Sequence, residues 1–132
     1  MSREPDVGVA SIQAQHEQLI ALFNEFEHCI KSDAALEVVQ DVVQRAITCA
    51  NEHFAHEEEL IERTGYPAAE EHRFLHRHMR LEFTTLVGNV LTTLSHDPVA
   101  LEHVDRMRSM LSDHITGPDK ELEAHLVAAG IR

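Results

Sequence analysis

The chain has little aromatic character and no long apolar run. Its 132 residues include no tryptophan, one tyrosine and five phenylalanines, although 43% of all residues are hydrophobic. Aliphatic side chains must therefore supply most of a buried core. The sequence shows neither a signal-peptide pattern nor an uninterrupted apolar segment of about 18 residues. We therefore expect a cytoplasmic protein that does not insert into membranes.

Positive charge is also scarce. Eleven Lys and Arg residues are outnumbered by 23 Asp and Glu residues, and the formal net charge is −12 at pH 7. Nucleic acids and anionic membrane surfaces are bound through clustered Lys and Arg, so neither is expected as a partner. The two cysteines, Cys29 and Cys49, are predicted to be reduced thiols within helices. The length and the lack of a repeat or linker predict a single domain over residues 1–132.

Four segments place an apolar side chain at every third or fourth position, which is typical of the buried face of an amphipathic helix. These apolar stripes run through residues 12–30, 39–57, 72–94 and 101–114. Short connections between consecutive helices favour antiparallel neighbours. The sequence therefore predicts an all-α protein, an antiparallel up-down-up-down four-helix bundle with a short C-terminal helix.

Capping residues predict where these helices begin and end. Ser32 and Asp33 are candidate N-caps of the second helix, and Gly65 suits its C-terminal exit. Pro67 suits the first turn of the third helix. The Asp-Pro pair at residues 97–98 indicates the N-cap and first turn of the fourth.

Six histidine and acidic side chains lie on the predicted buried faces of these helices. They are His16, His53, Glu57, His72, His76 and His114. Burying an imidazole or a carboxylate without a partner costs on the order of a few kcal/mol. One such residue could be a satisfied core histidine, but a shared metal cluster would satisfy all six together. In two pairs the spacing is four residues, so that both side chains project from adjacent turns and can bind a common metal.

Other histidines and acids compete less well for such a site. Glu58 and Glu59 are typical of a solvated face, and only Glu57 keeps the helical register with His53. His56 is the main competitor. The remaining histidines are predicted at the surface, or at most next to the ligands: His28, His78, His96, His103 and His125.

Asp119 admits two interpretations from spacing alone. Five residues of regular helix turn about 500°, which would leave Asp119 roughly 140° away from His114. A bend at Gly117 and Pro118 could swing it back toward the core. Alternatively, Asp119 caps a final helix covering residues 120–129.

Four sequence elements together resemble the hemerythrin family, specifically its bacterial members. They are Val7-Gly8-Val9 with Ile12, Gln15 and His16; His53-Phe54-x-x-Glu57-Glu58; Tyr66-Pro67 with His72-x-x-x-His76; and His114-Ile115-x-Gly117-x-Asp119-Lys120. The resemblance covers nearly the whole chain, and all seven expected ligand positions are filled. Three features depart from it: Gln13 stands where an acidic residue is common, a tryptophan near the N-terminus is missing, and Pro118 is unusual at its position.

The resemblance implies a centre of two Fe ions with an oxo or hydroxo bridge that binds O2 reversibly. In the family roles, one iron is held by His72, His76 and His114, the other by His16 and His53, and the bridging carboxylates are Glu57 and Asp119. Of about twelve octahedral positions, about one stays open for O2. We therefore expect an oxygen-binding protein for storage, delivery or sensing, not an enzyme, and the sequence leaves open whether a protein receives its O2. A di-iron redox enzyme (peroxidase, oxidase or nitric oxide reductase) and an iron reservoir are the alternatives.

Overall fold

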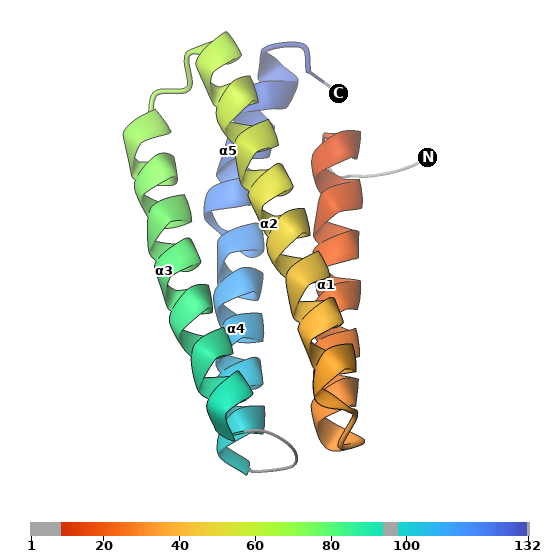
Figure 1. The fold of residues 1–132 in the computed structure, drawn as a ribbon. Coiled ribbons are helices and arrows are strands. Elements are labelled where there is room, and N and C mark those ends of the chain that lie inside the picture. Colours follow the sequence, from red (N-terminus) through yellow and green to blue (C-terminus); the bar gives the residue numbers. More distant parts are fainter. Residues whose placement is uncertain (1–8, 94–97, 132) are drawn as a thin grey trace.

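The computed structural model describes residues 9–93 and 98–131, and the regular structure of that part is helical. Five helices follow one another along the chain: α1 (Ala10–Lys31), α2 (Leu36–Thr64), α3 (Ala69–Thr93), α4 (Pro98–Thr116) and α5 (Pro118–Ala128). The first four run alternately up and down beside one another, and α5 continues beyond α4 at the end where α1 begins (Figure 1). The predicted all-α bundle with a short C-terminal helix is confirmed.

The residues of the turn between α1 and α2 have a different role from the predicted one. Ser32 donates its backbone N–H to the carbonyl of His28 at 2.9 Å and its hydroxyl to the carbonyl of Cys29 at 3.4 Å. Asp33 follows with a positive φ of 56°, a conformation that Asp tolerates better than most residues. These residues therefore end α1, and the prediction that they cap α2 is wrong. The N-cap of α2 is Ala35, which makes no side-chain cap hydrogen bond.

The turn between α2 and α3 was predicted in part. Gly65 ends α2 as predicted, with a φ of 64° that a residue without Cβ adopts at no steric cost. The third helix begins later than predicted, at Ala69, and Pro67 lies in the turn before it. The N–H of His72 bonds to the carbonyl of Ala68 at 3.0 Å, so the first helical turn excludes the proline.

The fourth helix and the break after it set the direction of the C-terminal helix. It begins at Pro98, as predicted for a first-turn proline, whereas the predicted cap Asp97 lies outside the described residues. A single residue, Gly117, with φ −110° and ψ −92°, separates α4 from α5. Pro118 then occupies the first turn of α5, where its missing N–H removes no helical hydrogen bond. This break redirects the chain immediately before Asp119.

Two apolar clusters fill the bundle, one on either side of a polar layer. The larger cluster includes Leu19, Phe54 and Leu111 and extends to the end that holds the α1–α2 turn. The smaller cluster joins the start of α1 to the end of α2 and to α5; its buried members are Val9, Ile12, Leu60, Ile61, Leu122 and Leu126. On α1, His16 lies between Ile12 of the smaller cluster and Leu19 of the larger cluster. The polar layer is therefore enclosed by apolar side chains at both ends.

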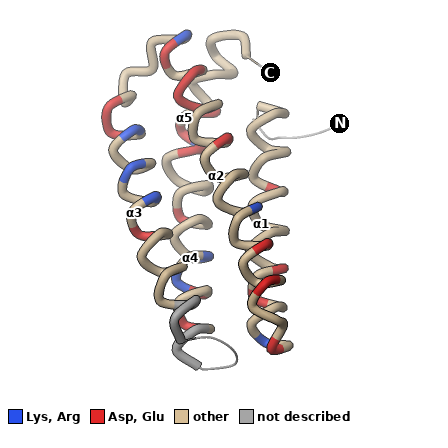
Figure 2. The backbone as a smooth tube through the Cα atoms, viewed as in Figure 1, with Lys and Arg blue, Asp and Glu red and all other residues tan. Residues whose placement is uncertain are grey.

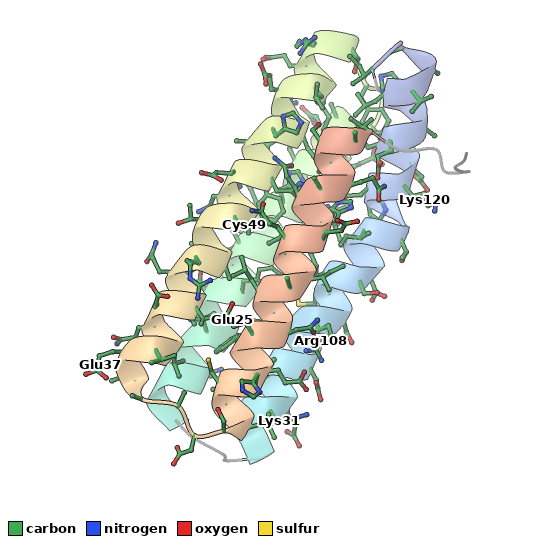
Figure 3. The ribbon with its side chains drawn as sticks, turned by 90° about the vertical axis from the view of Figure 1, so that its right-hand side faces the viewer. Glu25, Lys31, Glu37, Cys49, Arg108 and Lys120 are labelled. Carbon is green, nitrogen blue, oxygen red and sulfur yellow. The ribbon has the colours of Figure 1, made fainter. Side chains whose placement is uncertain are left out.

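Charged residues lie outside these clusters. Lys and Arg are few, and α3 carries several of them in its first half, whereas acidic residues occur on every helix (Figure 2). Ion pairs tie α1 to its neighbours: Arg45 on α2 contacts Glu25 at 2.8 Å, and Arg108 on α4 contacts Glu27. Figure 3 labels one partner of each pair, Glu25 and Arg108. Within the described ranges, no helix combines the length and apolar character needed to span a membrane.

Candidate metal centre

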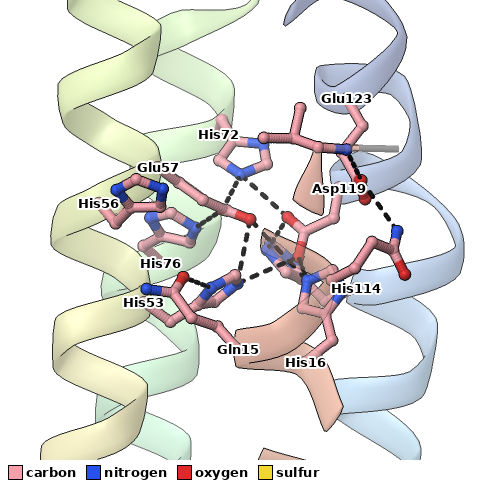
Figure 4. Close-up of polar contacts among 12 residues, drawn as sticks. Gln15, His16, His53, His56, Glu57, His72, His76, His114, Asp119 and Glu123 are labelled. Carbon is pink, nitrogen blue, oxygen red and sulfur yellow. Dashed lines mark hydrogen bonds and ion pairs between the residues drawn. The ribbon is translucent and has the colours of Figure 1, made fainter. Parts of the chain in front are cut away.

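The seven predicted ligand residues converge in the polar layer between the two apolar clusters (Figure 4). Each is at most 5% exposed. They come from all five helices: His16 from α1, His53 and Glu57 from α2, His72 and His76 from α3, His114 from α4 and Asp119 from α5.

Glu57 lies at the centre of this layer, and its two carboxylate oxygens face different histidines. Oε1 lies 2.9 Å from Nε2 of His72 and 3.0 Å from Nε2 of His76. Oε2 lies 3.0 Å from Nε2 of His53 and 4.0 Å from Nε2 of His16. One carboxylate thus connects imidazoles on three helices, which is the placement required of a bridge between two metal ions.

Asp119 divides its oxygens in the same way. Oδ1 lies 2.9 Å from Nε2 of His114 and 3.1 Å from Nε2 of His72. Oδ2 lies 2.9 Å from Nε2 of His16 and 3.5 Å from Nε2 of His53. Asp119 is fully buried in the first turn of α5, so the interpretation in which it caps a final helix is wrong. The break between α4 and α5 carries it into the core instead.

The donor atoms of the layer form two overlapping groups, and within each group they all lie within 4.8 Å of one another. One group contains Glu57, His72, His76, His114 and Asp119, and the other contains His16, His53, Glu57 and Asp119. The two carboxylates belong to both groups. Three imidazoles on one side and two on the other form a nitrogen and oxygen donor set that suits iron, and also zinc or copper.

Several buried atoms of the layer have no hydrogen-bonding partner among the described residues. They are Nδ1 of His16, Nε2 of His53, Oε2 of Glu57, Nε2 of His114 and Oδ1 of Asp119. All except the first take part in the short contacts described above, but without hydrogen-bond geometry. Each unpaired buried atom costs about 1–3 kcal/mol. Metal ions between these donors would satisfy the four atoms that take part in the short contacts, so the residues present fit a metal cluster.

Burial and charge pairing act in opposite directions on the ionisable groups of this layer. Burial lowers the pKa of His53 and of His72, but contacts with the two carboxylates outweigh it and raise both pKa values to about 9. Burial raises the pKa of Glu57, but the short contacts with His53, His72 and His76 outweigh it and lower the pKa to about 2. The surrounding histidines likewise hold the pKa of Asp119 far below its usual range, despite its burial. Both carboxylates are therefore ionised and ready to bind a cation.

Two further side chains hold histidines of the layer from outside. Nδ1 of His53 lies 2.7 Å from Oε1 of Gln15, and Nδ1 of His76 lies 2.8 Å from Oε2 of Glu58. When each Nδ1–H donates outward, the Nε2 atom of that ring faces the centre as an acceptor. The prediction that Glu58 lies on a solvated face therefore holds only in part, because its side chain is 30% exposed but its carboxylate contacts His76. The sequence signal for this contact is the position of Glu58 directly after Glu57. A residue about 100° further around α2 can reach the neighbouring helix α3.

The remaining histidines lie outside the layer wherever the structure describes them. His56, the main competitor, contacts the hydroxyl of Ser11 at 2.7 Å and does not join the cluster. Of the others, His28 and His78 are exposed, His103 and His125 are half-buried, and His96 lies outside the described residues.

Glu123 on α5 is a buried carboxylate that the sequence patterns did not reveal. It is 3% exposed, and its Oε1 accepts hydrogen bonds from the backbone N–H of Val9 and from Nε2 of Gln13, both at 2.9 Å. Glu123 lies one turn after Asp119 on α5, and Gln13 lies one turn before His16 on α1. These bonds therefore fix the start of α1 against α5 next to the metal centre. An acidic residue at position 13 would face a second carboxylate, so glutamine is the compatible residue here.

A family model described as Hemerythrin HHE cation binding domain matches residues 7–126. The chain therefore belongs to the hemerythrin family, a class of non-haem di-iron proteins that bind O2, and the predicted resemblance is confirmed. It is similar to a protein named Bacteriohemerythrin from Stenotrophomonas maltophilia (strain R551-3). The two are 27% identical over 129 residues, which cover 92% of this chain and 79% of that protein. No solved structure gives a significant match.

Proposed function

We propose that this chain binds O2 reversibly at a di-iron centre formed by the seven residues of the buried layer. The observation that carries the proposal is the division of these residues into two donor groups that share Glu57 and Asp119. One group has three imidazoles and the other has two, which matches the ligand roles of the family. Membership of the hemerythrin family supports iron as the metal and O2 as the ligand.

Each iron would take one of the two donor groups. His72, His76 and His114 would hold the first, His16 and His53 would hold the second, and Glu57 and Asp119 would serve both. On the family pattern, the iron with two histidines would keep a position open for O2. When bound, the reduced irons would supply the electrons that O2 accepts.

The chain itself contributes an apolar surrounding. Leu19 and Phe54 of the larger cluster flank the layer on one side, and Ile12 and Leu60 of the smaller cluster flank it on the other; each is at most 3% exposed. Excluding water and protons from a reactive centre suppresses side reactions. We therefore expect the apolar clusters to slow the oxidation of the irons to a form that no longer binds O2.

Binding is favoured over catalysis because the neighbouring acids already have partners. Among the buried residues that the structure describes, the acidic side chain outside the seven is Glu123, and it is held by Val9 and Gln13. Glu58 is held by His76. A general acid or base must reach the atom whose proton it transfers, and both carboxylates are engaged with protein groups in this structure. The histidine-rich donor set also differs from the carboxylate-rich set of ferritin-like di-iron proteins.

The proposal is tested by measuring the iron content of the protein and its visible spectrum. The spectrum is recorded for the reduced protein without air, again after air is admitted, and again after O2 is removed. We expect about two irons per chain and a charge-transfer band that forms with O2 and disappears without it. Two irons that oxidise at once without this band would indicate a redox enzyme, such as a peroxidase, oxidase or nitric oxide reductase. Iron that is released to a chelator without an O2-dependent band would indicate a reservoir. Zinc, or no metal, would overturn the di-iron proposal.

A further inference from the structure

A cavity of about 150 Å³ lies between α2 and α3 and extends inward to α1 and α4. None of the seven residues of the metal centre lines it. Its inner wall is aromatic, because four of the five phenylalanines of the chain surround it: Phe23, Phe26, Phe54 and Phe83. In a protein with so few aromatic residues, this concentration makes the cavity a distinct feature of the fold.

The polar residues that line the cavity lie at its mouth, between the outer faces of α2 and α3. They are Asn51 on α2 and Arg80 and Thr84 on α3. Nε of Arg80 donates a hydrogen bond to Oδ1 of Asn51 at 3.2 Å, so a side-chain bridge crosses the opening. The guanidinium carbon of Arg80 also lies 5.0 Å from the ring centroid of Phe54, within cation–π range. These two contacts hold the arginine over the entrance.

The size and lining of the cavity define the chemistry of its ligand. Enclosed apolar cavities of this volume stay free of ordered water and accommodate a molecule such as benzene or xenon, and the inner wall of this cavity is apolar in the same way. A polar ligand would lose hydrogen bonds to water and regain them only at the mouth. We propose that the cavity between α2 and α3 is a second ligand site, that it binds one compact apolar molecule, and that the Arg80 side chain is its lid.

The proposed apolar site is adjacent to the metal centre but separate from it. Phe54 lines the cavity and also stacks on the His76 ring, with centroids 4.3 Å apart and planes inclined by 24°. Arg80 lies 3.9 Å from Oε2 of Glu58, the carboxylate that holds His76. The ligand would therefore sit one aromatic ring away from the metal layer. Its binding needs none of the metal ligands, so the proposal does not depend on iron or O2.

The site is tested by titrating the 132-residue chain, with its native metal bound, with xenon and following the 129Xe chemical shift. Ala46 lines the cavity on α2, so Ala46→Leu places three additional carbon atoms there. Ala55 is exposed on the same helix, and Ala55→Leu is the matched control. We expect a saturable shift in the wild type and the control, and at least about tenfold weaker binding in Ala46→Leu. Xenon at the metal centre itself would bind equally well in both variants.

Two results would overturn the apolar site: a shift that never saturates in the wild type, or equal affinities in the two alanine variants. If circular dichroism shows that Ala46→Leu does not fold, Thr84→Leu decides instead, because Thr84 is exposed at the mouth and its replacement does not disturb the core. Reduced xenon affinity in that variant supports the site, and unchanged affinity overturns it.

The lid is tested by the rate at which bound xenon exchanges with free xenon. Arg80→Ala removes the bridge to Asn51, so we expect exchange to accelerate by about tenfold or more with the site still present. Arg77→Ala is the control, because Arg77 is exposed on α3 and does not line the cavity. Equal exchange rates in the wild type and Arg80→Ala would overturn the lid assignment.

Discussion

Oδ2 of Asp119 lies 2.9 Å from Nε2 of His16, although 103 residues separate the two in the sequence. The contact joins the first helix to the last and closes the ring of donors around the centre. It also depends on the one-residue break at Gly117, because an uninterrupted helix would point the carboxylate away from the core.

Replacing Asp119 with Asn tests whether this carboxylate is a bridging ligand. The variant keeps the shape of the side chain but removes its charge and one of its two acceptor oxygens. Loss of a residue that only supports a ligand weakens metal binding by about 10–100-fold, so loss of a bridge should cost at least that much. Competition with a chelator measures the effect. Asp113→Asn, at an exposed position of α4, should retain the iron of the wild type. Equal iron affinity in both variants would refute the bridging role.

Glu58 offers a test of the support given to a ligating histidine. Glu58→Ala removes the acceptor that lies 2.8 Å from Nδ1 of His76, so the ring loses its fixed orientation and part of its basicity. We expect iron affinity to fall by about 10–100-fold. Glu59→Ala, the adjacent exposed position on α2, should leave the affinity unchanged. If both variants lose iron to a chelator at the wild-type rate, the carboxylate does not support the centre.

Glu123 is expected to contribute to the stability of the fold. Glu123→Ala leaves the backbone N–H of Val9 and the amide of Gln13 without their acceptor, and we expect the free energy of unfolding to fall by about 1–3 kcal/mol. Urea denaturation at equal iron loading measures this. Glu123→Gln retains an acceptor oxygen and should lose less.

The control for this carboxylate is Glu121→Ala, because Glu121 is exposed on the same helix. It should shift the urea midpoint little. A midpoint for Glu123→Ala that coincides with that of the control would show that the bonds to α1 do not stabilise the fold.

Most of the fold and of the candidate site follows from one physical regularity. The apolar stripes have the period of an α-helix, and six of the seven site residues lie on the same stripes, so a single pattern marks both the core and the polar layer. His16, for example, falls in register between Ile12 and Leu19, and all three are buried. Such a pattern is visible in the sequence because it repeats every three or four residues.

Features that depend on contacts between distant segments are not visible in this way. Glu123 has its partners more than 100 residues away, and no local spacing distinguishes it from an exposed glutamate. The orientation of Asp119 depends on backbone angles at one glycine, which spacing left undecided. Ser32 and Asp33 have side chains that suit an N-cap. They nevertheless lie at the end of α1, because Ser32 bonds back to that helix and α2 begins only at Leu36.

The apolar surrounding of the centre is tested at Leu19, which lies one turn after His16 on α1 and is 1% exposed. Leu19→Thr introduces a hydroxyl that can hold water and deliver a proton near the open iron position of the proposed centre. We expect the irreversible oxidation of the oxygenated form to be at least about ten times faster. A tenfold change in rate corresponds to roughly 1.4 kcal/mol in the activation barrier. Loss of the visible O2 band with time measures the rate. Ile20→Thr, at the adjacent exposed position, is the matched control and should decay as the wild type does. Equal lifetimes in the two variants would mean that water exclusion at this position does not control the oxidation.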